Sequence, residues 1–406
     1  MRVLGINGLG RIGKLAVWRS LANGHFGRLV VNTGREVGTS LADLASYLES
    51  DSTYGQLSRY LHGHKGDALR PVLRVDDPGA GLLRCGDVEI VVLRKARNPK
   101  DIEWHRHDAG LVVDTTGVFT DPTRDAGHEK GALRGHLEAG ARKVINSSAF
   151  KLKTNQRVPD DAVTLIYGIN HHAYDSSMHH VISAASCTTT ALAHMLKPLL
   201  EAEPTSRILT ASMSTIHAAT NTQSVLDAVP AAAATDLRKN RMMLDNIILT
   251  STNAAKALGT VIPVINDIGF MADSVRIPTS TVSLVTLNLT VQAQIGVDGE
   301  SSVSREVVNG ILEKAGSGGQ AGLLLFNREQ KVSCDFKGVD AAVVIEANDT
   351  HTRTAFIHLK ATDLGLEKDL KIPVTHIKIF GWYDNELGSY TGQLLRLARH
   401  IDDALS

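Results

Sequence analysis

Residues 7–13 read Asn-Gly-Leu-Gly-Arg-Ile-Gly and space three glycines as G-x-G-x-x-G. The apolar residues 3–7 before this motif predict a short buried strand, and the residues after it have helical spacing. In such a setting Gly8 permits the tight turn, Gly10 lets the backbone approach a pyrophosphate, and Gly13 lets the helix pack closely on the strand. The motif therefore predicts a dinucleotide-binding site at the start of the chain.

The first half of the chain continues with short apolar segments that have helical patterns between them. Further strands are predicted at residues 28–32, 88–93, 110–115 and 143–146, and a helix is predicted at 15–21. Strands that alternate with helices indicate a doubly wound parallel sheet. The first half is therefore predicted to be an α/β domain of the Rossmann type.

The second half has longer alternating or β-branched segments and fewer helices. Strands are predicted at residues 207–216, 281–293, 343–346, 355–359 and 376–380, with a covering helix near 304–314. This pattern favours an α+β domain with a mixed, largely antiparallel sheet.

Two domains are expected, because 406 residues with 43% hydrophobic content can form two cores. The NAD(P)-binding domain is predicted to comprise residues 1–186 and 386–406, since the amphipathic segment 390–401 can pack back on it. Residues 187–385 are predicted to form the domain that carries the chemistry.

The composition excludes several classes of partner. Lys plus Arg equals Asp plus Glu at 43 each, so no global field draws the protein to nucleic acid or to an anionic membrane. Three scattered cysteines do not make a disulfide framework, and we expect a reducing, cytoplasmic location. The chain runs from Met1 directly into a strand, which predicts no leader peptide, and no apolar run is long enough to span a membrane. No metal site is predicted, because the adjacent histidines at 171–172 and 179–180 lack ligand spacing.

The cofactor position at the end of the second strand departs from the usual pattern. An acidic residue commonly binds the ribose hydroxyls there, but this chain has Thr33 followed by Gly34 and Arg35. A threonine hydroxyl and a guanidinium could accept a 2′-phosphate, which would allow the use of NADP. Glu36 could restore the acid from a shifted loop, so the choice between NAD and NADP stays open at this point.

Two further residues suggest thiol chemistry. Cys187 lies at the start of a helix-forming run, where the helix N-terminus can stabilise a thiolate and the first amides can hold an oxyanion. His217 lies thirty residues later, at the end of an apolar strand, and a histidine beside a cysteine can carry its proton. The sequence alone does not show that the two residues meet.

Seven motifs in fixed order extend this picture from residue 3 to about 401. They are residues 7–13, Thr115-Thr-Gly-Val-Phe119, Ser186-Cys-Thr-Thr189, Thr215-Ile-His217 with Thr220, Ser251-Thr252 with Ala254-Ala-Lys256, Arg276-Ile-Pro-Thr279 and Trp382-Tyr-Asp-Asn-Glu386. Together they closely resemble the phosphorylating glyceraldehyde-3-phosphate dehydrogenases. The resemblance implies oxidation of glyceraldehyde 3-phosphate to 1,3-bisphosphoglycerate, with inorganic phosphate as a second substrate.

The resemblance also implies residue roles. Cys187 would be the nucleophile, passing through a thiohemiacetal and a thioester, and His217 its base and later its acid. Cofactor binding is implied for Gly8, Gly10, Arg11, Ile12, Gly13, Thr33, Arg97, Thr116, Ser147 and Asn385, of which Asn385 would fix the nicotinamide carboxamide. Substrate or phosphate binding is implied for Ser186, Thr188, Thr220, Arg238, Thr252, Arg276 and the backbone at Asn253.

Several departures from the family pattern bear on specificity. Asn253 stands where a glycine is usual, Thr190 where an asparagine is usual, and Ser389 where an aromatic residue is usual. Weaker phosphate binding at Asn253 would favour a related phosphosugar dehydrogenase, such as one acting on erythrose 4-phosphate with water as acyl acceptor. A dinucleotide-sensing protein without catalysis is a further alternative.

The chain also has more residues than is usual for the family that its motifs resemble. The extra length lies near 231–235, in a loop that usually crosses to a neighbouring subunit's cofactor, and between 349 and 373. The resemblance implies a homotetramer.

Overall fold

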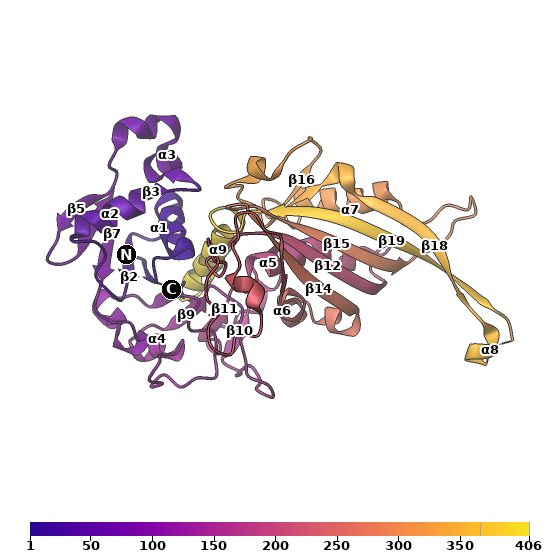
Figure 1. The fold of residues 1–406 in the computed structure, drawn as a ribbon, viewed down its shortest axis with the longest axis horizontal. Coiled ribbons are helices and arrows are strands. Elements are labelled where there is room, and N and C mark those ends of the chain that lie inside the picture. Colours follow the sequence, from indigo (N-terminus) through magenta and orange to yellow (C-terminus); the bar gives the residue numbers. More distant parts are fainter. Residues whose placement is uncertain (366, 406) are drawn as a thin grey trace. The chain divides into compact units, whose positions relative to one another are not determined.

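The computed structural model describes residues 1–365 and 367–405. Leu366, within the predicted extra segment 349–373, and Ser406, the last residue of the predicted first domain, lie outside the described residues. The chain divides into two compact units, Met1–Ser186 with Tyr390–Ser406, and Cys187–Ser389. Figure 1 shows the helices and strands of both units.

The first unit is built on a sheet that, within the described residues, has nine strands in the order β10-β11-β9-β8-β1-β2-β7-β6-β5. The strands are β1 (Val3–Asn7), β2 (Arg28–Asn32), β5 (Arg74–Asp77), β6 (Leu82–Cys85), β7 (Val88–Leu93), β8 (Leu111–Asp114), β9 (Lys143–Asn146), β10 (Ala162–Thr164) and β11 (Val181–Ser183). Pairing is parallel from β10 to β7, and β6 and β5 add an antiparallel edge. The predicted Rossmann-type class is confirmed.

The helices of this unit begin and end at recognisable signals. They are α1 (Arg11–Asn23), α2 (Leu41–Glu49), α3 (Leu57–His62), α4 (Arg134–Glu138) and α9 (Ser389–Asp403), and a small sheet pairs β3 (Ser50–Asp51) with β4 (Gly55–Gln56). Helix α1 stops at Gly24, whose left-handed backbone (φ 63°) lets its amide bond the carbonyl of Ser20. Helix α2 begins with a capping box between Ser40 and Asp43.

The second unit has a mixed sheet, in which the described strands run β13-β14-β12-β15-β19-β17-β16 and β18 pairs with β19. Their bounds are β12 (Ile208–Ala218), β13 (Ile248–Ser251), β14 (Gly269–Ile277), β15 (Ser283–Gln292), β16 (Leu324–Asn327), β17 (Val343–Glu346), β18 (His351–Leu359) and β19 (Leu370–Tyr383). Only β12–β14 and β16–β17 are parallel pairs among these. The predicted α+β class with a mixed sheet is confirmed.

One face of this sheet forms the core of the second unit. Along β15, Val285, Leu287 and Leu289 are fully buried, while the residues between them are half-buried. Helices α5 (Cys187–Glu201), α6 (Ala254–Val261) and α7 (Arg305–Ser317) contact the sheet. The period-2 burial explains why this strand was predictable.

The two segments of extra length take different forms. Residues 231–235 lie in the irregular chain between β12 and β13. Residues 349–373 lengthen β18 and β19 into a two-stranded ribbon, paired from His351 and Lys378 to Leu359 and Leu370, which projects from the sheet and carries the short helix α8 (Ala361–Leu364) at its tip (Figure 1). Most of β18 is exposed.

Candidate active site

Cys187 is the first residue of α5, as its helix-forming context predicted. The turn before it holds Ala185 at a positive φ of 56°, a conformation that a residue with a Cβ rarely adopts. The sulfur of Cys187 therefore lies at a helix N-terminus, where the first-turn amides point toward added negative charge.

His217 is the penultimate residue of β12 and is buried. Its Nε2 lies 3.9 Å from Sγ of Cys187. The structure thus brings together the two residues for which the sequence predicted thiol chemistry.

Asn385, which follows β19, completes the surroundings of the sulfur. Its Nδ2 lies 3.9 Å from Sγ of Cys187 and 3.3 Å from Nε2 of His217. Its Oδ1 accepts a 2.9 Å hydrogen bond from the hydroxyl of Ser283, which itself accepts from the amide of Ala218 at 3.0 Å. Ser283 therefore fixes the amide of Asn385 with its donor end toward the sulfur.

Arg276, on β14, reaches the far side of the imidazole. Its Nη1 lies 2.5 Å from Nδ1 of His217 and 3.3 Å from the carbonyl oxygen of Ala218. Its Nε is buried and has no hydrogen-bond partner among the described residues. A buried guanidinium with an unused donor suits an anion-binding position.

The site shifts the acid-base behaviour of both central residues. Burial raises the pKa of the Cys187 thiol, against the lowering effects of the Asn385 amide, the Arg276 charge and Thr188. Burial and then the charge of Arg276 lower the pKa of His217 to about 4. At neutral pH His217 is therefore uncharged, so it is available as a proton acceptor rather than as a permanent cation.

A hydroxyl network lies under the site. Tyr383 is fully buried, and its hydroxyl oxygen is 2.7 Å from Oγ1 of Thr188 and 2.8 Å from Oγ1 of Thr215. Burial raises the pKa of Tyr383, so its hydroxyl stays protonated. The network anchors the first turn of α5 to β12 and β19.

The other residues predicted to bind phosphate, Ser186 apart, make hydrogen bonds with their own neighbours in the chain. Oγ1 of Thr252 accepts from the amide of Ala254 at 3.2 Å, and Asn253 precedes α6 with a negative φ of −93°, so its Cβ causes no strain. Thr220 bonds Gln223 at 2.9 Å, and Arg238 pairs with Asp236 at 2.8 Å on the exposed chain after β12. Among the described residues these four make no hydrogen bond with Cys187 or His217. Ser186, the last residue of the first unit before α5, is half-buried.

In the first unit, the glycine motif has the geometry that a dinucleotide requires. Gly8 has a φ of 95°, and a Cβ on Gly13 would lie 2.0 Å from the carbonyl oxygen of Gly8. A Cβ on Gly10 would meet no atom within 4 Å, which leaves open space beside the start of α1. The motif therefore fits a pyrophosphate at this turn. Arg11 forms an ion pair with Asp51, and Ile12 is half-buried in α1.

A groove opens beside this motif along the ends of β1, β2 and β8. The predicted cofactor residues Gly8, Thr33, Arg97 and Thr116 all line it. The side chain of Arg97 donates to the carbonyl of Gly34 at 3.2 Å. Ser147 does not line this groove, and its carbonyl accepts a hydrogen bond from the hydroxyl of Tyr390.

The floor of the groove is held by a buried polar network. The indole of Trp104 donates to Nδ1 of His136 at 2.9 Å, so the proton that faces Asp114 is on Nε2, which lies 3.0 Å from the fully buried carboxyl group. Asp114 also accepts from Asn7 at 2.7 Å and from the amide and hydroxyl of Thr116 at 3.0 and 2.6 Å. These hydrogen bonds fix the groove residues Asn7 and Thr116 in place.

Comparison with known proteins covers almost the whole chain. The family model "Glyceraldehyde 3-phosphate dehydrogenase, NAD binding domain" matches residues 2–122, and the model of the C-terminal domain of the same family matches residues 186–385. Glyceraldehyde-3-phosphate dehydrogenase of Geobacillus stearothermophilus is 33% identical over 98% of this chain and 97% of its own length. Glyceraldehyde-3-phosphate dehydrogenase 2 of Trichormus variabilis is 32% identical over the same shares. Glyceraldehyde-3-phosphate dehydrogenase 1 of Streptomyces avermitilis is 32% identical over 99% of both chains.

The chain belongs to the glyceraldehyde-3-phosphate dehydrogenase family. The resemblance inferred from the seven motifs is thereby confirmed. Members of this family are oxidoreductases, and the match to the NAD-binding domain supports NAD or NADP as cofactor.

Sequence reasoning missed two parts of this glyceraldehyde-3-phosphate dehydrogenase family site. Ser283 acts through the strand register that sets it opposite Tyr383. The sequence marks it only as a serine at an inward-facing position of a strand in which buried residues alternate with half-buried ones. The Trp104–His136–Asp114 network joins segments far apart in the chain, and no local motif marks it.

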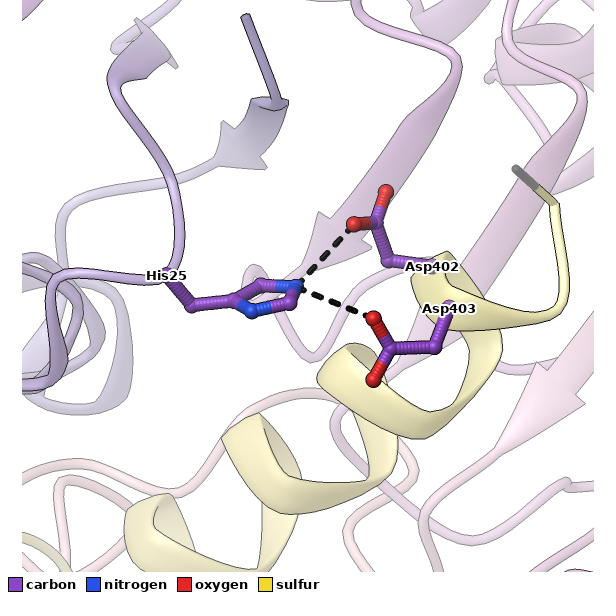
Figure 2. A group of neighbouring side chains, drawn as sticks. All are labelled: His25, Asp402 and Asp403. Atoms are coloured by element: carbon purple, nitrogen blue, oxygen red, sulfur yellow. Dashed lines mark hydrogen bonds and ion pairs between the residues drawn. The ribbon is translucent and has the colours of Figure 1, made fainter.

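One cluster in this family member has the composition of a metal site. His25, Asp402 and Asp403 offer ligand atoms within 4.8 Å of one another (Figure 2). Arg2 forms ion pairs with both carboxylates, at 3.2 Å to Asp402. Because a guanidinium already compensates the acidic charge, we assign the cluster to holding α9 against the start of β1. None of the described helices is long and apolar enough to cross a membrane.

Proposed function

We propose that this chain oxidises glyceraldehyde 3-phosphate to 1,3-bisphosphoglycerate, reversibly, with NAD or NADP and inorganic phosphate. The observation that carries the proposal is the grouping of His217, Asn385 and Arg276 around Cys187, with Nε2 of His217 3.9 Å from Sγ. A nucleophile, a neutral base, an amide donor and a cation are the groups that thiol-dependent aldehyde oxidation needs.

The first step is addition of sulfur to the aldehyde. His217 takes the thiol proton as the Sγ of Cys187 bonds to the carbonyl carbon, and a thiohemiacetal forms. The charge on the former carbonyl oxygen is stabilised by the backbone amide of Cys187 at the start of α5 and by the proton now on His217. His217 is uncharged before this step, because its pKa lies at about 4, and its imidazole can therefore accept a proton.

The next steps leave the thiol regenerated. A bound nicotinamide supplies the acceptor for the hydride that leaves the carbon. Cys187 then holds the carbon as a thioester, an activated acyl group. An oxygen of inorganic phosphate attacks that carbon, the carbon–sulfur bond breaks, and the acyl phosphate is released. The thiolate of Cys187 takes back the proton held by His217, and the proton of the attacking phosphate passes to water.

The roles of the remaining residues are part of the same proposal. The first unit would hold the dinucleotide along the groove at Gly8, Thr33, Arg97 and Thr116, and the second unit would carry the thiol chemistry. Support comes from the open space at Gly10 and from the unused buried donor of Arg276. The two phosphates are proposed to be bound by Thr188, Thr220, Thr252, Asn253, Ser186 and Arg238. The cofactor is proposed to be contacted by Gly13, Arg11, Ile12 and Ser147. Asn385 is proposed to hold the carboxamide of the nicotinamide.

The test is the initial rate with glyceraldehyde 3-phosphate, with NAD or NADP, each with and without inorganic phosphate. We expect phosphate-dependent turnover that Cys187→Ser abolishes. Cys334→Ser is the matched control, because Cys334 is an exposed cysteine away from the site, and it should leave the rate unchanged. Turnover that does not need phosphate would point to the erythrose 4-phosphate type of enzyme. Tight dinucleotide binding without turnover of glyceraldehyde 3-phosphate or erythrose 4-phosphate would point to a dinucleotide-sensing protein without catalysis.

We also propose that the protein is a cytoplasmic homotetramer, by analogy with its family. Light scattering of the purified chain tests the assembly, with four copies expected. A monomer or dimer at working concentration would overturn that part of the proposal.

A further inference from the structure

The groove in the first unit carries information about which dinucleotide it takes. Its wall at the end of β2 is formed by Thr33, Gly34 and Arg35, and facing residues include Arg97, Glu129 and Lys130. In NAD-binding folds of this type a carboxylate at the end of the second strand binds the ribose hydroxyls, and its charge repels a 2′-phosphate. The charges along this wall therefore discriminate NAD from NADP.

Thr33 does not replace that carboxylate. Its hydroxyl donates to the carbonyl of Arg35 at 2.6 Å and lies 3.2 Å from the carbonyl of Leu93. The hydroxyl proton is thus used to shape the loop. Thr33 places no negative charge in the groove, and the loop that it shapes presents Arg35.

Glu36, the other candidate for the missing acid, is held elsewhere. Its carboxylate pairs with Arg94 at 3.0 Å, its side chain is 68% exposed, and it does not line the groove. The acid that could have restored NAD binding is therefore engaged with Arg94, the residue that follows β7.

The charged residues that do line the groove are mostly cationic. They are Arg35, Arg97 and Lys130, against the single carboxylate of Glu129. Arg97 is held by its bond to the carbonyl of Gly34, next to Arg35. In the described part of the chain, the guanidinium of Arg35 has no ion pair, so its donors are available to a ligand.

We propose that Arg35, with Arg97 beside it, forms a subsite for the 2′-phosphate of NADP, and that the chain binds NADP in preference to NAD. The inference rests on the proposed function only in that a dinucleotide occupies this groove. A phosphate dianion gains charge-assisted hydrogen bonds from the guanidinium of Arg35, whereas at the end of β2 a free 2′-hydroxyl finds no carboxylate that could accept a hydrogen bond from it.

The test measures binding, not turnover. Isothermal titration of the full chain compares NADP with NAD, and 2′,5′-ADP with 5′-ADP, fragments that lack the nicotinamide. We expect at least about tenfold tighter binding of the 2′-phosphorylated member of each pair, the size of one charge-assisted hydrogen bond. Arg35→Ala should remove most of that difference and leave the affinity for NAD and 5′-ADP unchanged.

Two further variants sharpen the test. Lys95→Ala is the matched control, because Lys95 is an exposed cation of the next loop that does not line the groove. Thr33→Asp restores the usual acid and should reverse the preference. Equal affinities within each pair, or an equal loss for both members in Arg35→Ala, would overturn the inference and leave the proposed function intact. Failure to bind any of the four ligands would instead count against the proposed function itself.

Discussion

Nη1 of Arg276 lies 2.5 Å from Nδ1 of His217, and the same Nδ1 lies 2.8 Å from the carbonyl oxygen of Ala218. A guanidinium can only donate, so the contact with Arg276 needs a lone pair on Nδ1 and puts the proton of neutral His217 on Nε2, facing the sulfur. The contact with Ala218 needs the opposite tautomer. An anion that draws Arg276 away would therefore leave Nε2 as a proton acceptor.

Arg276→Leu should raise the pKa of His217 above its present value of about 4, because the charge of Arg276 is the second cause of the lowering after burial. Burial remains, so the pKa should stay below the ordinary value of about 6.5. The measurement is an NMR titration with labelled histidine. The same variant should lose about 100-fold in kcat/KM, since it removes a buried charge-assisted contact. Arg241→Leu, which removes an exposed arginine paired with Asp227, is the control and should change neither quantity.

Lowering the pH should destabilise the fold through His217. Its pKa falls from 6.5 in the unfolded chain to about 4 in the folded one, so the unfolded chain binds more protons between these values. This contribution of His217 to the free energy of unfolding is fully present above pH 6.5 and is lost as the pH falls through 4. Its full size is about 3 kcal/mol. Urea unfolding at pH 7, 5.5 and 4 measures it. His217→Gln should lack this part of the pH dependence, and an identical dependence in both proteins would contradict the assignment.

Alkylation of Cys187 should titrate above the ordinary thiol value of about 8.5, because burial raises the pKa of this thiol. Iodoacetamide rates against pH, in a background with Cys85 and Cys334 changed to serine, report Cys187 alone. Asn385→Leu removes the amide donor and should move the midpoint up by about one further pH unit. Ser283→Ala should move it in the same direction by less, as expected of a positioning residue. A midpoint in Asn385→Leu equal to that of the parent would show that the amide does not reach the sulfur in solution.

Asp114→Asn should weaken both the fold and the groove. The new amide nitrogen would face one of the donors from Asn7, Thr116 or His136, and leaving that donor unsatisfied costs about 2 kcal/mol. Urea unfolding measures the loss, and titration with the better-bound dinucleotide should show reduced affinity. Asp108→Asn, at an exposed position, is the control. If Asp114→Asn is as stable as the parent, the network does not depend on both side-chain oxygens of Asp114 as acceptors.

The parts of the fold that could be predicted are those in which local pattern and tertiary role agree. Strands β1, β2, β9 and β17 were predicted with their observed bounds, because strands buried on both faces are continuous apolar runs. Strand β7 was also predicted with its observed bounds, although only Ile90 and Val92 in it are buried. Strand β14 was not predicted, since only Ser274 in it is buried and the strand is defined by its pairing with β12 and β13. Strand β18 begins four residues before its predicted start, in a threonine-rich stretch whose partner lies in β19.

In the candidate site, too, the features that depend on neighbouring residues could be predicted, and those that depend on tertiary contacts could not. The context of Cys187 at a helix start was readable from neighbouring residues, but its approach to His217 depends on the packing of α5 and β12, and the family resemblance supplied it. Ser283 could not have been selected, because its role comes from the register that sets it beside Tyr383 and near Asn385. Glu36 was a candidate acid in the sequence, and only the pairing with Arg94 takes it out of the groove.

The thiol and its partners all belong to Cys187–Ser389, while the groove with Thr33 and Arg35 belongs to the unit that begins at Met1. A codon change at position 33 or 35 therefore alters no hydrogen bond around Cys187. One or two substitutions at these positions can therefore change the preference for NAD or NADP. The residues around the sulfur of Cys187 stay the same.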